Sequence, residues 1–164
     1  MPPRRTAAAA RAASPEKQIA AFLAKYTSRI RAVAKAARTK VRARLPGAVE
    51  LVYDNYNALV IAFGPSDRAG DIIVSLAIYP RWVTLFFLRG AKLPDPQGLL
   101  KGSGPEIRHV VLDGAATLDT PPVRALIAAA RAGARLPLPT SGPRRVVIKS
   151  VSAKQRPRRP PAGA

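Results

Sequence analysis

The 164-residue chain contains no cysteine, one histidine and nine acidic residues. The lack of cysteine excludes disulfides, thiolate metal sites and cysteine nucleophiles. A single histidine cannot supply the usual ligands of a zinc site, and no serine has the strand-to-helix context of a triad nucleophile. Among the acids, Asp67 and Asp71 lie near each other with Arg68 between them, whereas iron delivery needs clustered carboxylates. We therefore expect no metal, no cofactor and no catalytic residues of a known type.

Long uninterrupted hydrophobic runs are also absent. The longest, residues 72–88, is broken by Pro80 and Arg81 and is too short for a membrane span. The N-terminal residues carry charge but lack the apolar stretch of a secretory signal. We expect a cytoplasmic protein with no membrane span. The length fits one domain, and a hydrophobic content of 48% is enough for a core.

Positive charge dominates the composition, with 28 Lys and Arg against nine acids and a net charge of +19. Residues 1–14 and 135–164 contain basic residues and no acid, residues 15–45 contain one acid, and residues 46–134 are balanced. The two terminal segments are rich in Pro, Ala, Arg and Gly, so we predict disordered basic tails flanking a domain at 15–134. Residues 144–151 are apolar enough to pair with a sheet edge, and this alternative stays open.

Apolar spacing predicts helices at both ends of the domain. Ser14 followed by a proline has the pattern of a helix start, and apolar residues then recur every three or four positions as far as Val41. A break near residues 26–28 is an open alternative. A second helix begins at Thr120, with prolines in its first turn, and ends at Gly133.

Five strands are predicted between these helices. A hairpin-like turn at "DNYN" joins the first pair, and Pro80 with Arg81 reverses the chain between the next pair. The predicted ranges are 49–54, 58–63, 72–79, 82–88 and 106–112. An N-terminal amphipathic helix, about five mostly antiparallel strands and a C-terminal helix predict an α+β fold in two layers.

Four segments resemble the YdhG-like domain family, over roughly residues 15–133. They are "VYDNYNALVIAFGP", "IYPRWVTLFFLRGAKLPDP", "LLKGSGPEIRHVVL" and "VRALIAAA". The resemblance implies a small intracellular α+β domain of unknown function, without established catalytic residues. Some members are described as frataxin-like iron chaperones, but the few scattered acids of this cationic chain disfavour that activity.

The basic helix face and tails are the strongest functional signal. On a helix, one stripe opposite the apolar face carries Lys17, Arg31, Lys35, Arg38 and Arg42, a second flank carries Lys25, Arg29 and Lys40, and Glu16 is the only acid near them. Clustered Lys and Arg neutralise phosphates without reading sequence. We predict contacts with nucleic acid or another polyanion. The predicted contact residues are Lys17, Arg31, Lys35, Arg38, Arg42, Arg144, Arg145, Lys149, Lys154, Arg156, Arg158 and Arg159.

A module that binds a protein partner or a small ligand in a sheet pocket is the second interpretation. Glycine-rich backbone at 102–104, next to Arg108 and His109, could hold an anion. The same stretch fits a turn that leads into a strand with a half-buried histidine, which we favour. Trp82 could stack on a planar ligand, although a core position is favoured. The residues of this predicted pocket are Tyr53, Asn55, Arg81, Trp82, Ser103, Arg108 and His109.

Overall fold

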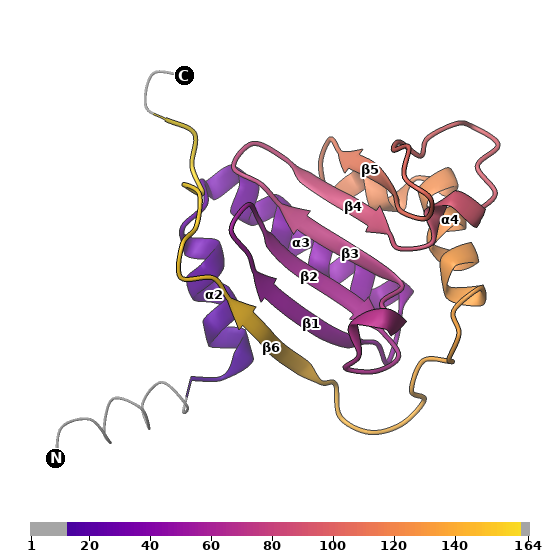
Figure 1. Cartoon of the computed structure of the whole chain (residues 1–164), viewed down its shortest axis with the longest axis horizontal. Coiled ribbons are helices and arrows are strands. Elements are labelled where there is room, and N and C mark those ends of the chain that lie inside the picture. Colours follow the sequence, from indigo (N-terminus) through magenta and orange to yellow (C-terminus); the bar gives the residue numbers. More distant parts are fainter. Residues whose placement is uncertain (1–12, 162–164) are drawn as a thin grey trace, which may run out of the picture.

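The computed structural model describes residues 13–161, which form a six-stranded mixed sheet with three α-helices packed on one face (Figure 1). The predicted α+β class is confirmed, and residues 1–12 of the predicted N-terminal tail lie outside the described residues. The helices are α2 (Pro15–Ala24), α3 (Ser28–Arg44) and α4 (Pro121–Ala132). The strands are β1 (Val49–Asp54), β2 (Leu59–Gly64), β3 (Val74–Ile78), β4 (Val83–Phe87), β5 (Arg108–Leu112) and β6 (Val146–Val151). Short 3-10 turns are η1 (Ala69–Asp71), η2 (Gly90–Lys92) and η3 (Ala115–Asp119).

The first predicted helix is two helices, and the break has a physical cause. Ser14 caps α2 by accepting a hydrogen bond from the Lys17 amide at 3.2 Å, and Thr27 caps α3 in the same way. Between them the fully buried Tyr26 turns into the core. Its hydroxyl donates to the Ile78 carbonyl at 2.7 Å and accepts from the Leu59 amide at 3.2 Å. The tyrosine at the break therefore links the helical layer to two central strands of the sheet, β2 and β3.

The strands lie in the order β5-β4-β3-β2-β1-β6, and every neighbouring pair is antiparallel except β1 and β6. Both predicted hairpins, β1–β2 and β3–β4, are confirmed. Alternate side chains of each strand face the helices, and Ile61, Leu76 and Leu85 are fully buried there. In β1 this alternation also points Glu50 and Asp54 toward the helices, where both are buried.

The prediction of five strands is wrong, because β6 forms within the segment predicted as a disordered tail. It pairs in parallel with β1, and Val146 and Ile148 pack against the main core. The Glu50 amide donates to the Arg145 carbonyl at 3.0 Å, and the Ser152 amide donates to the Asp54 carbonyl at 2.9 Å. Apolar side chains and a free β1 edge are together sufficient to order this segment.

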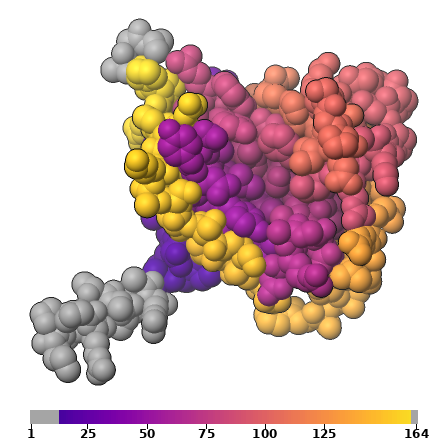
Figure 2. Space-filling model, in the orientation of Figure 1, coloured from indigo at the N-terminus to yellow at the C-terminus, as the bar shows by residue number. Residues whose placement is uncertain are grey.

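The residues after β6, 152–161, form what we call the C-terminal strap, which runs along the β1 side of the molecule (Figure 2). Arg158 is buried in it, and its Nη2 donates to Asp54 Oδ1 at 2.9 Å. Arg159 donates to the carbonyls of Lys25 and Ala24, at the C-terminal end of α2. The strap thus neutralises a buried carboxylate and satisfies open helix carbonyls, so this part of the predicted tail belongs to the fold.

In residues 13–161, no helix is long and apolar enough to cross a membrane.

Candidate functional site: a basic groove between two helices

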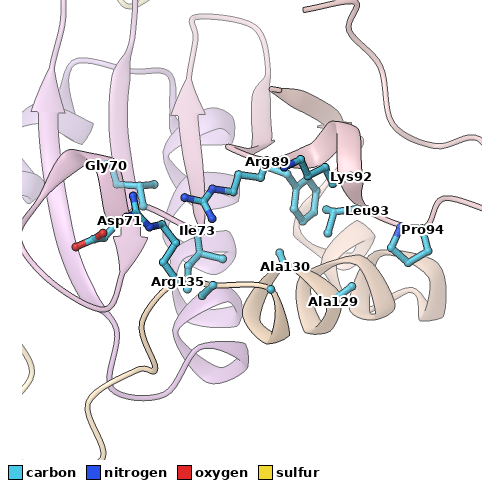
Figure 3. Close-up of a pocket in the computed structure, with 14 residues that line it drawn as sticks. Gly70, Asp71, Ile73, Arg89, Lys92, Leu93, Pro94, Ala129, Ala130 and Arg135 are labelled. Atoms are coloured by element: carbon cyan, nitrogen blue, oxygen red, sulfur yellow. The ribbon is translucent and has the colours of Figure 1, made fainter. Parts of the chain in front are cut away.

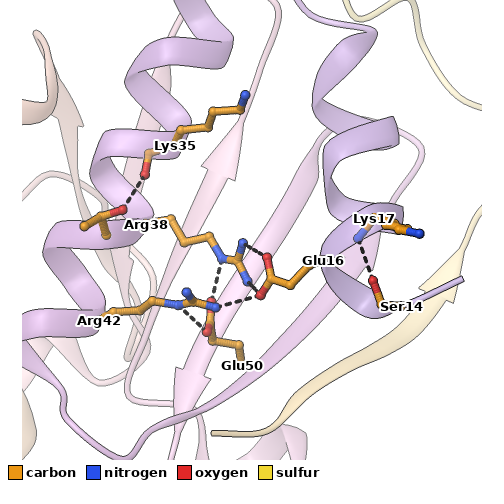
Figure 4. Close-up of polar contacts among 8 residues, drawn as sticks. Ser14, Glu16, Lys17, Lys35, Arg38, Arg42 and Glu50 are labelled. Carbon is orange, nitrogen blue, oxygen red and sulfur yellow. Dashed lines mark hydrogen bonds and ion pairs between the residues drawn. The ribbon is translucent and has the colours of Figure 1, made fainter.

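Two members of the predicted basic stripe are not free to bind a polyanion. Arg38 is only 9% exposed, and its Nε donates to Glu50 Oε1 at 2.7 Å while both terminal nitrogens donate to Glu16 at 2.8 Å (Figure 4). Arg42 donates to Glu50 at 2.6 Å and to Glu16 at 3.0 Å. This four-residue ion cluster joins α2, α3 and β1 and carries no net charge.

The ion cluster is held in its charged state by its own contacts. The hydrogen bond from Arg38, supported by Arg42 and by both positive charges, lowers the pKa of Glu16 from its ordinary value of 4.5 to about 2. Burial opposes the charge of Arg38, but the hydrogen bonds to Glu16 and Glu50 outweigh it and raise the pKa of the guanidinium. A buried carboxylate such as Glu50 requires partners of this kind. The predicted role of Arg38 and Arg42 in polyanion contact is therefore corrected to a structural one.

The predicted basic arm is also largely engaged with the protein. Arg158 and Arg159 make the contacts of the C-terminal strap, and the Arg156 guanidinium lies 5.8 Å from the centre of the Tyr56 ring. Arg145 pairs with the Asp67 carboxylate at 3.2 Å, and Lys149 donates to the Asp67 carbonyl at 3.0 Å. Of the predicted contact residues, Lys17, Lys35, Arg144 and Lys154 stay exposed without a carboxylate partner among the described residues, and Arg31 is half-buried.

The residues of the predicted sheet pocket are separated in the structure. Tyr53 lies on β1 and Asn55 in the turn after it, whereas Arg81 and Trp82 lie in the β3–β4 turn. β1 and β4 are three strand spacings apart in the sheet, about 14 Å. The favoured core position of Trp82 is wrong, since 46% of the residue is exposed and its ring lies 5.5 Å from that of Tyr79.

The stretch around the only histidine is a turn that leads into a strand, as favoured. His109 is half-buried on β5, with its ring 5.4 Å from Phe86. Arg108 donates to the carbonyls of Gly104 and Ile107, so its guanidinium closes this loop. Ser103 is exposed in the same loop. These contacts engage the Arg108 side chain within its own loop.

The structure instead assembles basic residues that the sequence interpretation overlooked. Four arginines line an open groove of about 1020 Å³ between the end of α3 and the outer face of α4, namely Arg44, Arg124, Arg131 and Arg135. Alanines make up much of its floor, and no acid is among the residues that line it. We call this surface the α3–α4 groove. Its signal in the sequence is the seven-residue spacing of Arg124 and Arg131, which places them on one face of α4, and Arg135 follows the end of that helix.

Positive charge in the α3–α4 groove is largely uncompensated. Lys40 contacts the Asp119 carboxylate at 2.6 Å, and this hydrogen bond, with the charges of Arg44 and Arg124, lowers the pKa of the Asp119 carboxyl. Other acids are used elsewhere in the fold: Glu16, Glu50, Asp54 and Asp67 all form ion pairs with basic residues. Because no carboxylate lines the groove itself, its four arginines leave this face positive.

Comparison with protein-family models, curated proteins and solved structures finds no match to this chain. The resemblance to the YdhG-like family accordingly stays a prediction.

Residues 13–161 contain no group of three His, Cys, Asp or Glu residues placed to hold a metal ion.

Proposed function

We propose that the protein is a non-enzymatic binding protein that contacts nucleic acid through the α3–α4 groove, without reading its sequence. The observation that carries this proposal is a groove lined by four arginines and no carboxylate. Guanidinium groups bind phosphate oxygens in a bidentate manner, and the small alanine side chains of the floor allow a backbone to approach closely.

The expected binding energy comes mainly from release of counterions when arginines neutralise phosphates. Each phosphate neutralised on B-form DNA contributes about −0.9 to the slope of log K against log salt. The exposed Lys17 on α2 and the exposed Lys35 on α3 add to the long-range field. They favour encounter with the anion rather than a fixed contact.

The test compares two fourfold variants of equal charge by fluorescence anisotropy with a short duplex DNA over a range of salt concentrations. The groove variant carries Arg44→Gln, Arg124→Gln, Arg131→Gln and Arg135→Gln. The control carries Arg68→Gln, Arg81→Gln, Lys101→Gln and Lys154→Gln, all of them exposed residues outside the groove. We expect the groove variant to flatten the salt slope by about 3–4 units and the control to change it far less.

An unchanged slope in the groove variant would overturn the proposal. An equal loss in both variants would also overturn it, because binding would then follow net charge rather than the groove. Thermal unfolding of both variants verifies that the fold is retained, as expected for side chains outside the core.

A further inference from the structure

A second cavity, smaller and more enclosed than the α3–α4 groove, lies at the C-terminal end of α4. Its volume is about 300 Å³, and it is bounded by the start of β3, the end of β4, η2 and the C-terminal end of α4 (Figure 3). Ile73 and Phe87 form a buried apolar wall, and Leu93 and Ala130 are half-buried beside them. None of the residues predicted for a sheet pocket lines this cavity.

The cavity stays open because α4 presents small side chains at this point. Val123, Leu126 and Ile127 fill the core along the first turns of the helix, whereas Ala129, Ala130 and Ala134 line the cavity near its end. A leucine in place of an alanine would occupy much of the space. The apolar pocket is therefore a consequence of the alanine-rich end of the helix.

Three cations surround the mouth of this apolar cavity. Arg89, Lys92 and Arg135 all line it, and none forms an ion pair with a carboxylate in the described part of the chain. In Figure 3 the side chains of Arg89 and Arg135 come from different segments of the chain, and Arg89 extends toward Ile73 while Arg135 extends toward Asp71. The only acid in the lining is Asp71, whose Oδ2 accepts a hydrogen bond from Ser66 at 2.7 Å.

We propose that this cavity binds a small organic anion, with a carboxylate or phosphate head at the three cations and an apolar body against Ile73 and Phe87. Ligand pockets combine an apolar lining with a few converging polar groups, and their volumes begin at about 300 Å³. A cavity of roughly 150 Å³ accommodates benzene, so this one suits a single ring or a medium-length chain. The three cations would hold the anionic head by charge-assisted hydrogen bonds.

This inference is independent of the nucleic-acid proposal. Ala134 and Arg135 line both the cavity and the α3–α4 groove, and Arg135 is the one charged residue that they share. Arg89 and Lys92 line the cavity alone, and Arg124 and Arg131 line the groove alone. Variants at the unshared positions therefore test each site separately.

Isothermal titration of the full chain with four probes of equal chain length tests the chemistry of the ligand. Octanoate and octyl phosphate carry the anionic head, 1-octanol is neutral, and octylamine is cationic. We expect one saturable site for the anions, with at least about tenfold weaker binding of 1-octanol and no binding of octylamine. The ratio of octyl phosphate to octanoate affinity identifies the preferred head group. Equal affinity for octanol and the anions would overturn the proposal.

Two variants locate the site. Arg89→Gln with Lys92→Gln removes charge from the mouth and is expected to weaken octanoate binding about tenfold or more. Ala130→Leu fills the cavity without changing any charge and is expected to abolish binding. The matched control, Arg124→Gln with Arg131→Gln, is expected to leave octanoate affinity unchanged. Unaltered binding in the double charge variant would overturn the assignment even if Ala130→Leu failed to fold.

Discussion

The two flanks of helix α3 carry similar arginines and use them in opposite ways. On the flank toward α2, Arg38 and Arg42 are enclosed by Glu16 and Glu50 in a neutral ion cluster. On the flank toward α4, Arg44 lines an open groove with three further arginines and no carboxylate. The first flank holds the elements of the fold together, and the second presents positive charge to solvent.

This difference arises from the acids rather than from the arginines. A strand contributes Glu50 and the start of α2 contributes Glu16, and both reach the same side of α3. On the α4 side Asp119 is engaged by Lys40, and no carboxylate lines the α3–α4 groove. The functional value of a basic residue on a helix therefore depends on which acids the rest of the fold brings to it.

The largest effect is expected from breaking the ion cluster. Arg38→Met removes a partner of the fully buried Glu50, and loss of one member of a buried ion pair costs about 3–5 kcal/mol. Arg44→Met on the other flank is expected to change the free energy of unfolding by less than about 1 kcal/mol, since Arg44 has no carboxylate partner among the described residues. Urea unfolding at pH 7 measures both. Equal effects would mean that the two flanks do not differ in structural role.

The second-largest effect is expected from acid, which should weaken the ion cluster between α2 and α3. The pKa of Glu16 is about 2 in the folded protein and 4.5 ordinarily, so its contribution to the free energy of unfolding is fully present above pH 4.5. It is lost as the pH falls from about 4.5 to about 2, because the unfolded chain then binds a proton that the folded chain resists. Across this pH range, the midpoint temperature of thermal unfolding should fall less for Glu16→Gln than for the wild type. Identical declines would exclude Glu16 as a source of acid sensitivity.

The smallest effect is expected at the single acid of the other flank. Asp119→Asn removes the ion pair with Lys40. Both side chains of this pair are substantially exposed, so the free energy of unfolding should change less than in Glu16→Gln. Loss of a negative charge beside Arg44 and Arg124 should instead raise affinity for duplex DNA modestly. Anisotropy at low salt measures this change. A fall in affinity would place the DNA away from the α3–α4 groove.

Local signals in the sequence predict local structure well in this chain. Ser14 with its following proline marks the start of α2, and the turns at "DNYN" and at Pro80 define two hairpins that the structure confirms. In each case the residues that determine the conformation are within a few positions of one another. The same holds for α4, whose prolines and apolar spacing precede Gly133.

Pairings between distant segments were not predictable in the same way. Nothing near Arg38 indicates that Glu50 of a later strand will face it, and nothing near Val146 indicates a parallel pairing with β1. The proposed organic-anion cavity takes Arg89 and Lys92 from the segment after β4 and Arg135 from the segment after α4, so no single motif encodes it. Such sites depend on the three-dimensional arrangement of elements, which sequence spacing alone does not specify.

The parallel pairing of β6 with β1 has a consequence for the order of folding. β6 is the last strand of the sheet to be synthesised, and its partner is the first. Until β6 and the C-terminal strap have left the ribosome, β1 is an open edge and Asp54 lacks its partner Arg158. Pairing then requires closure of a long loop, which slows the step. Sheet completion is therefore a late event, and the β1 edge stays open to other pairings until then.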